Sequence, residues 1–324
     1  MVSFKLDFFR NRNRFLFFKF HGPSESLPTL FAYMEQTIDR YRNQGQYRTG
    51  ETYSTTLNSF RKFRSGRDVS WTKLDGALLE AYESHLRQKG LSPNTISFYM
   101  KHLRAVYNRA VDDGLVVDRK PFKRVTTTAE KTVKRAISVE LIKQLKELNY
   151  TRSPSLAFAR DMFLFSFYTR GMSFVDIAYL QKKDLQGDML SYRRKKTGQR
   201  LAVRWEPCMQ EILNAHGAPS SSPYLFSIIR NPEEDSRKQY QYVFFRVNRH
   251  LKKIGKEMGL LRPLTLYCAR HSWASIAREE GIPLSIISEG MGHDSEKTTQ
   301  IYLASLKTEV IDQANSRILN LLSM

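Results

Sequence analysis

The segment from Leu156 to Tyr168 is apolar on nearly every face, and this pattern limits the possible folds of the chain more than any other. Its large apolar residues do not fall on one side of a helix but surround it: Phe158, Met162, Phe163, Leu164, Phe165 and Phe167. A helix that is hydrophobic all round lies inside a core, so other elements must cover it from every direction. No uncharged apolar run reaches the ~18 residues of a transmembrane span. We therefore expect this helix at the centre of a domain.

Helical periodicity also dominates from about Leu27 to Asp118. Two apolar stripes recur every three to four residues: Leu30, Met34, Ile38 and Tyr41, then Leu78, Tyr82 and Leu86. Gly90 is a candidate C-terminal cap of the second stripe. Ser92-Pro93 supplies an N-cap followed by proline at the first helical position, and Ser138 is a second candidate N-cap.

Strand periodicity occurs in one place. Residues 189–205 read MLSYRRK, then KTGQ as a turn, then RLAVRW, which predicts a β-hairpin. The fold class expected is mainly α, with a small antiparallel hairpin or sheet in an α+β second domain.

Length and composition predict two domains. At roughly 150 residues per domain, 324 residues correspond to two. Residues 119–137 lack a helical stripe and carry seven basic residues against Glu130: Arg119, Lys120, Lys123, Arg124, Lys131, Lys134 and Arg135. We expect an N-terminal basic-aromatic arm at 1–25, a helical domain at 26–118, a basic linker at 119–137 and a larger domain at 138–324. The linker follows a phosphate backbone or is a solvated connector.

The N-terminal arm has seven phenylalanines in its first twenty residues, but charges interrupt the apolar run and no small-residue cleavage site follows. This pattern argues against a secretory signal. A disordered arm, an extended segment packed on the body and translated sequence ahead of the natural start all stay open.

The charge balance points to a polyanionic partner. The chain has 52 Lys+Arg against 32 Asp+Glu, a formal net charge of +20. The helix predicted after Ser92 carries a polar face that enters a DNA groove or is simply solvated: Asn94, Ser97, Lys101, Arg104 and Asn108. With only Cys208 and Cys268, the chain has neither a disulfide framework nor a CxxC metal pair, which fits a reducing interior.

Three polar clusters interrupt the buried segments of the second domain. Arg170 follows the apolar helix, with Asp176 six residues later. Arg270-His271 lies within an apolar helical pattern, and Gly292-His293 precedes Tyr302. A buried guanidinium needs a carboxylate partner or an anionic ligand, because a lone buried charge is too costly.

These residue types suit attack on a phosphodiester without a metal ion. Two guanidiniums can hold the charge on the non-bridging oxygens, and a lysine can protonate the leaving alkoxide. Neighbouring cations lower the phenolic pKa of about 10, which favours a tyrosine nucleophile. The absence of HExxH, of an acidic metal cluster and of GxxxxGKS counts against metal-dependent nucleases and ATPases.

At this point the chain resembles the tyrosine recombinases of the phage-integrase family. The motifs that carry the resemblance are TRGMS around Arg170, the KTG hairpin, ARH, MGH and the tyrosine nine residues after His293. They occur in the family's order, and the helical first domain is similar to the family's core-binding domain. The resemblance implies a core-binding domain and a catalytic domain that form a clamp around DNA.

The resemblance also implies a role for each matched residue. Tyr302 would form a 3′-phosphotyrosyl link and free a 5′-hydroxyl. Arg170 and Arg270 would hold the phosphate, His293 would hydrogen-bond to it, and Lys196, or the adjacent Lys195, would protonate the leaving oxygen. Asp176 would support Arg170, and His271 would serve packing and hydrogen bonding. We expect DNA contacts from residues of the first domain and the linker: Lys101, Arg104, Lys123, Arg124, Lys134 and Arg135.

One position departs from the family pattern. The family has His-x-x-Arg, whereas this chain has Tyr267-Cys268-Ala269-Arg270. A phenol can orient a phosphate, but its pKa makes it a poor general base at neutral pH. The identity of the base therefore stays open, and His271 is an unproven alternative.

The resemblance further implies how the protein works in the cell. It implies double-stranded DNA with paired recombination sites as partner, no cofactor or metal, and a cytoplasmic, nucleoid-associated location. The apolar stripe of residues 307–324 predicts a helix that covers its own core or is exchanged between subunits of a homotetramer, and the resemblance favours the exchange. Inversion, integration and excision are all open, although the short segment before the first domain favours a simple-site enzyme. The alternatives are a type IB topoisomerase and a non-catalytic DNA-binding regulator.

Overall fold

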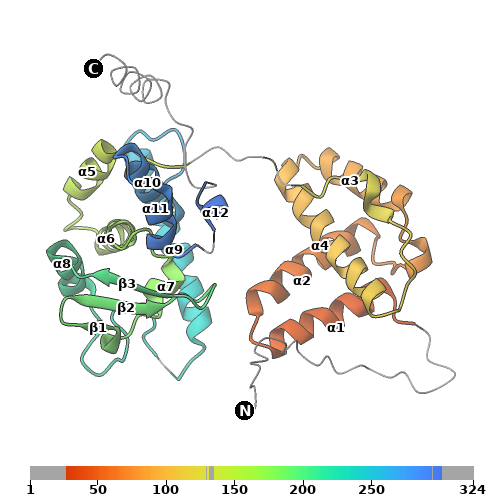
Figure 1. Ribbon diagram of the computed structural model, residues 1–324, viewed down its shortest axis with the longest axis horizontal. Helices are drawn as coiled ribbons and strands as arrows, with labels where there is room; N and C mark the ends of the chain where they lie inside the picture. The colour runs from red at the N-terminus through yellow and green to blue at the C-terminus, as the bar shows by residue number, and fades with distance from the viewer. Residues whose placement is uncertain (1–26, 129, 131–134, 232, 294, 301–324) are drawn as a thin grey trace, which may run out of the picture. The chain divides into compact units, whose positions relative to one another are not determined.

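The computed structural model describes residues 27–128, 130, 135–231, 233–293 and 295–300. The chain divides into two compact units, Met1–Thr132 and Val133–Met324, and each is considered by itself. Helices dominate both units, and all strands of the described residues lie in the second (Figure 1). The prediction of a mainly α fold with a small antiparallel sheet is confirmed. No helix in the described ranges is long and apolar enough to cross a membrane.

The described part of the first unit contains four α-helices and two short 3₁₀ helices: α1 (Leu30–Asn43), α2 (Tyr47–Phe63), η1 (Trp71–Lys73), α3 (Gly76–Gln88), α4 (Pro93–Asp112) and η2 (Pro121–Arg124). The apolar stripes found in the sequence form its core. Leu30, Met34 and Ile38 of α1 are buried, as are Tyr82 and Leu86 of α3. Helix α1 packs along α2, and α4 packs against both α2 and α3.

The predicted junction between α3 and α4 has the expected caps. The backbone of Gly90 is left-handed, with φ of 70°, and the Leu91 amide donates to the Leu86 carbonyl at 3.2 Å. This is the Schellman arrangement that ends a helix. The Ser92 hydroxyl accepts from the Thr95 amide, and Pro93 is the first helical residue.

The start of the expected linker packs against the first unit. Pro121–Arg124 forms η2, and Phe122 and Val125 are buried in the core of the first unit. Basic residues alternate with these apolar side chains, so the high charge of the segment hid its apolar contacts. The packed first unit therefore extends past residue 118.

The described part of the second unit has eight α-helices, one 3₁₀ helix and three strands. They are α5 (Val139–Glu147), α6 (Pro154–Tyr168), α7 (Phe174–Ala178), η3 (Lys182–Asp184), β1 (Leu185–Gln186), β2 (Met189–Arg193), β3 (Arg200–Arg204), α8 (Pro207–His216), α9 (Ser236–Glu257), α10 (Leu266–Glu279), α11 (Leu284–Gly290) and α12 (Glu296–Gln300). The predicted N-cap of α5 is present, because the Ser138 hydroxyl accepts from the Leu141 amide.

Helix α6 lies at the centre of the second unit, as its sequence predicts. It packs against α5, α7, α8, α9 and α10. The Phe165 ring meets Phe226 edge-on, with ring centroids 4.8 Å apart, and its centroid is 5.9 Å from that of Trp205. Contacts on all sides explain why α6 lacks a polar face.

The sheet contains the predicted hairpin and one more strand. Strands β1, β2 and β3 are antiparallel and adjacent in that order, with Met189 opposite Arg204 and Arg193 opposite Arg200. Along β2 the side chains alternate between exposed and buried, so Leu190 and Tyr192 face the core. The two-residue strand β1 is too short to show a period in the sequence.

Truncation of Phe165 to alanine will test the central position of α6. The ring is fully buried, so its loss leaves a cavity, and we expect the second unit to lose about 3 to 5 kcal/mol of unfolding free energy. Urea denaturation followed by circular dichroism measures this change. Leu261→Ala, at a fully exposed position, is the matched control and should have little effect. Equal losses in both variants would contradict the assignment of α6 as the core helix.

Candidate active site

Arg170 lies in a tight turn at the end of α6. Both Arg170 and Gly171 have left-handed backbones, with φ of 59° and 75°, and the Gly171 amide donates to the Ser166 carbonyl at 2.7 Å. A non-glycine residue in this region costs of order 1 kcal/mol and is retained where the surrounding structure requires it. The turn directs Arg170 towards the sheet, where Nη1 lies 3.4 Å from the Ala202 carbonyl oxygen.

Gly171 permits a close approach of helix α10. A Cβ atom at this position would lie 2.7 Å from both Cα and Cγ of Arg270, a distance that real Cβ atoms do not show. Two physical requirements therefore explain why the TRGMS motif has glycine at this position: the backbone is left-handed, and helix α10 lies too close for a side chain. It brings Arg170 and Arg270, a hundred residues apart in sequence, to neighbouring positions.

Arg270 is buried in α10 and joins three segments of the unit. Its guanidinium donates to the Gly171 carbonyl and to the Met291 carbonyl, each at 2.7 Å. Its Nη2 also lies 2.8 Å from Nε2 of His293. These contacts align the planar group against the end of α6, the end of α11 and the turn that follows it.

The His293 imidazole is half-buried and held at both nitrogens. Because a guanidinium can only donate, Nε2 accepts from Arg270, and the neutral ring then donates from Nδ1 to Oγ1 of Thr299 at 2.7 Å. Burial lowers the pKa of His293 to about 4, and the charges of Arg270, Arg194 and Lys196 add to the effect. His293 is therefore neutral at physiological pH in the absence of an anion.

The β2–β3 turn separates its two lysines. The Lys195 amide donates to Oδ1 of Asp176 at 2.8 Å, and its ammonium lies over the Tyr179 ring, 4.2 Å from the centroid. The Lys196 side chain is exposed, and its charge is among those that lower the pKa of His293. Of the two lysines that the sequence left open, Lys195 is held against Asp176 and Tyr179, and Lys196 is the one whose charge acts on His293.

Asp176 differs from the expectation that it supports Arg170. The buried carboxylate accepts from the Ser173 hydroxyl at 2.6 Å and from the Lys195 amide, and in the described ranges it makes no ion pair with Arg170. The reason is geometric: Arg170 turns towards β3, whereas Asp176 in α7 faces the hairpin turn. Its hydrogen bonds position the lysine-bearing turn.

Tyr267 and His271 lie one turn apart on α10. The Tyr267 side chain is half-exposed, whereas His271 is buried, and their rings meet edge-to-face with centroids 4.6 Å apart. The residue in the family's histidine position therefore reaches the surface, supported from below by an imidazole.

Arg194 is a site residue that our sequence interpretation missed. It directly follows β2, is buried, and donates from Nη1 to the Gly292 carbonyl. Burial raises the pKa of the Tyr192 phenol, and the charges of Arg194, Arg270 and Arg170 oppose part of this rise. A signal was present: the period of two that buries Leu190 and Tyr192 also places residue 194 on the inner face.

Two of the expected residues cannot be located. Tyr302, the expected nucleophile, and Lys134 lie outside the described residues.

The other expected DNA-contact residues are all exposed: Lys101, Arg104, Lys123, Arg124 and Arg135. Arg104 donates to the Thr127 hydroxyl at 3.3 Å, and Arg124 lies 3.9 Å from a carboxylate oxygen of Glu80. Ser97, expected on the same polar face of α4, is buried instead, because a small hydroxyl is compatible with the helix interface.

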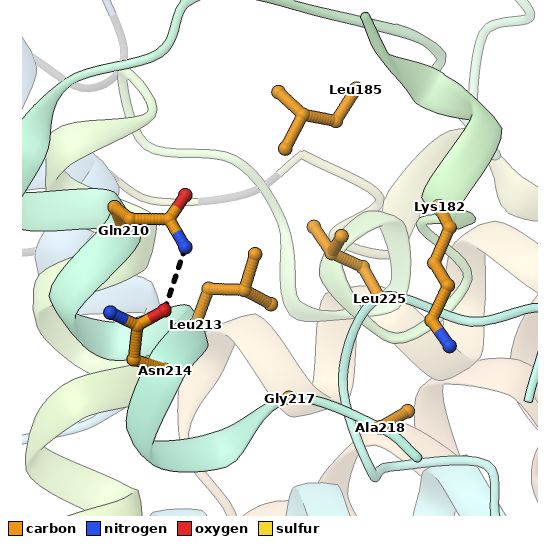
Figure 2. Close-up of a pocket in the computed structure, with 8 residues that line it drawn as sticks. All are labelled: Lys182, Leu185, Gln210, Leu213, Asn214, Gly217, Ala218 and Leu225. Carbon is orange, nitrogen blue, oxygen red and sulfur yellow. Dashed lines mark hydrogen bonds between the residues drawn. The ribbon is translucent and has the colours of Figure 1, made fainter. Parts of the chain in front are cut away.

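A cavity of about 490 Å³ lies elsewhere in the second unit, beside α8 (Figure 2). Three leucines give it an apolar wall: Leu185, Leu213 and Leu225. The one cation that lines it, Lys182, donates to the carbonyls of Pro219 and Ser220, and Gln210 is bonded to Asn214. None of the candidate catalytic residues lines this cavity.

Both units of the chain match known protein families. Residues 29–144 match the phage integrase SAM-like domain, and residues 144–309 match the model of the phage integrase family, which covers half of the chain. The chain belongs to the phage integrase family. This membership confirms the resemblance to tyrosine recombinases and the prediction of a site-specific DNA recombinase.

Individual members of the phage integrase family are distant relatives. Tyrosine recombinase XerD of Listeria innocua is 23% identical over 267 residues, which cover 77% of this chain and 86% of the relative. Tyrosine recombinase XerA of Pyrococcus furiosus is 28% identical over 239 residues, covering 71% and 77%.

Solved structures of phage integrase family members share the fold. The Tn1549 transposon integrase in complex with transposon right end DNA aligns with a TM-score of 0.66 at 16% identity, covering 90% of this chain and all of the other. A lambda integrase tetramer bound to a Holliday junction aligns with a TM-score of 0.63 at 16% identity, covering 87% and 79%.

The protonation of His293 will test the charge balance of the site. We expect its imidazole to titrate with a midpoint of about 4, well below the usual value, in an NMR titration of the DNA-free protein. Lys196→Gln removes a nearby positive charge and should move the midpoint upwards. His293→Asn assigns the resonance. A wild-type midpoint near 6.5, unchanged by Lys196→Gln, would show that the cations do not converge on this ring.

Proposed function

We propose that this protein cuts and rejoins DNA at specific sites through a covalent 3′-phosphotyrosyl intermediate. The observation that carries the proposal is the arrangement around Arg270, whose guanidinium is fixed by Gly171, Met291 and His293 and lies next to the turn that carries Arg170. The charge of Lys196 acts on His293, a contact of the same guanidinium. Such a group of fixed donors and cations suits the charge of a phosphoryl transition state. Membership of the phage integrase family supports the same chemistry.

The chemistry of the first step is as follows. The Tyr302 phenol loses its proton to solvent, which neighbouring cations favour, and the phenolate oxygen attacks phosphorus. The P–O5′ bond breaks as the new O–P bond forms, and the Lys196 ammonium gives its proton to the departing 5′ oxygen. Arg170 and Arg270 hold the non-bridging oxygens throughout.

Rejoining is the reverse of cleavage. A 5′-hydroxyl attacks the phosphotyrosine, returns a proton to Lys196 and releases Tyr302. One phosphoester replaces another in each step, so the cycle needs no ATP. An incoming phosphate also favours protonation of His293, because an anion close to the ring raises the pKa that the cations lower. The protonated Nε2 cannot keep its contact with the Arg270 donor. It would exchange this contact for a hydrogen bond donated to the phosphate.

We further propose how the protein engages DNA. The exposed residues Lys101, Arg104, Lys123, Arg124 and Arg135 would contact phosphates, with Lys134. The first 120 residues contain 20 basic against 12 acidic residues, a charge of +8, and the remainder carries +12. Because both parts are cationic, we expect both units to bind the duplex and the binding to be sensitive to salt.

The assembly would be a homotetramer on two recombination sites, with the segment 307–324 exchanged between subunits. The lambda integrase tetramer on a Holliday junction is similar in fold and supports this arrangement. Inverted sites would give inversion, direct sites excision, and separate molecules integration. The reaction would take place in the cytoplasm on nucleoid DNA.

A suicide DNA substrate will test the proposed chemistry. A nick near the scissile phosphate lets the cleaved fragment diffuse away, so the covalent adduct accumulates and migrates as a shifted band in a denaturing gel. We expect an adduct with the wild type, none with Tyr302→Phe, and at least 100-fold slower formation with Arg270→Ala. Tyr302→Phe should still bind the site in a filter-binding assay.

The outcomes also separate the alternatives. Recombinant junctions from a two-site substrate exclude simple relaxation by a topoisomerase. A wild type that binds its site but forms no adduct would identify a non-catalytic regulator and overturn the proposal.

The role of Tyr267 has its own test. If the phenol only orients the phosphate, Tyr267→His should retain or raise the rate of adduct formation, because an imidazole fills the same role and also accepts a proton at neutral pH. Single-turnover rates at pH 6 to 9 measure the effect. Complete loss of cleavage in this variant would show that the phenol makes a contribution that histidine cannot replace.

A further inference from the structure

A buried arginine connects the lysine-bearing hairpin to the turn that carries His293. Arg194 directly follows β2, and 8% of its surface is exposed. Its Nη1 donates to the Gly292 carbonyl, 98 residues away in sequence. The contact is therefore a tertiary one, made by a side chain in the hairpin to a backbone group outside it.

The backbone of Arg194 also closes the hairpin turn. Its amide donates to the Gln199 carbonyl at 2.9 Å, and its carbonyl accepts from the Gly198 amide at 2.8 Å. Lys195 and Lys196 lie in the loop that these two hydrogen bonds close. A displacement of Arg194 therefore moves the whole turn, and Lys196 with it.

Gly292 shows how closely the two segments approach. Its φ is 65°, and a Cβ atom there would lie 2.9 Å from Cδ of Arg194 and 2.8 Å from Cδ1 of Leu201. A side chain at this position would force the side chains of Arg194 and Leu201 to shift, and it would require a left-handed backbone that favours glycine. The next residue is His293, which contacts Arg270.

From these contacts we infer that Arg194 is a positioning residue that fixes Lys196 relative to His293 and Arg270. The inference rests on the proposed function, in which Lys196 protonates the leaving oxygen. Asp176 and Tyr179 hold the other side of the same turn through Lys195. The turn is thus anchored to α7 on one side and to the segment after α11 on the other.

Arginine suits this position for two reasons. The guanidinium is long enough to reach the Gly292 carbonyl from the end of β2. An arginine also keeps its charge when it is buried, whereas burial lowers the pKa of a lysine. Arg194 also lies near His293, because it donates to the carbonyl of the preceding residue, and its charge helps to lower the pKa of that ring. In the described ranges no carboxylate is within ion-pair distance of Arg194, so the hydrogen bond to Gly292 is its anchoring contact there.

A modified substrate separates positioning of Lys196 from a general effect on the fold. When sulfur replaces the bridging 5′ oxygen, the leaving group is a thiol with a pKa of about 8.5, which departs without protonation. A variant that misplaces the proton donor is therefore rescued by this substrate. A variant whose whole site is disrupted cleaves both substrates slowly and is not rescued.

We expect Arg194→Met to slow single-turnover cleavage of the ordinary suicide substrate by about 100-fold, the size of a general-acid contribution. Cleavage of the sulfur-bridged substrate should fall less than about five-fold, and we expect Lys196→Ala to show the same pattern on the two substrates. Arg200→Met, at an exposed position on the same hairpin, is the matched control and should cleave both substrates normally. Thermal melting establishes that each variant is folded.

A second variant keeps the inference testable if Arg194→Met does not fold. Gly292→Ala introduces a methyl group that pushes the Arg194 side chain away from the Gly292 turn. Its cleavage should likewise be slow on the ordinary substrate and nearly normal on the sulfur-bridged one. Equal loss on both substrates in either variant, or no loss on the ordinary one, would overturn the inference. A wild type that cleaves neither substrate would instead overturn the proposed function.

Discussion

The hydrogen bonds of the Arg270 guanidinium are the constraint on which the second unit depends. A buried charge is costly unless its donors are satisfied, and Arg270 satisfies its donors with the carbonyls of Gly171 and Met291 and with His293. These acceptors come from two segments, the turn after α6 and the turn after α11, so both turns must lie at fixed positions against α10. The left-handed turn at Arg170 and the lack of a side chain at Gly171 follow from that requirement.

The site concentrates positive charge and directs its acidic neighbour elsewhere. Asp176 is bonded to the hairpin turn rather than to Arg170, so it orders the lysines without neutralising the guanidinium. His293 stays neutral because it lies among cations in a half-buried place. A bound anion would balance the excess positive charge of this site, and a phosphodiester is an anion of the required kind.

Local patterns in the sequence predicted the elements well. The all-apolar segment at 156–168, the caps at Gly90 and Ser92 and the hairpin around KTGQ depend on neighbours within a few residues, and the structure has each of them. The motifs grouped Arg170 with Arg270, and the close approach at Gly171 brings these two residues to neighbouring positions.

Contacts between distant segments could not be predicted in the same way. The partner of Asp176, the different directions of Lys195 and Lys196, and the burial of Phe122 depend on tertiary packing that no local period records. Arg194 is a different case, because the alternation along β2 already placed it on the buried face. Its charge argued for the surface, and charge was the weaker guide in a strand with one buried face.

The position of Arg270's acceptors has a consequence for how the chain matures. Its partners lie 99 residues before it and 21 to 23 residues after it, so the guanidinium is held in this arrangement only when nearly the whole unit has folded. A nascent or partly unfolded chain keeps its basic residues, which attract DNA, but it lacks the ordered guanidinium to which we assign the binding of the scissile phosphate. Completion of the fold thus acts as a safeguard, separating attachment to the genome from the ability to break it.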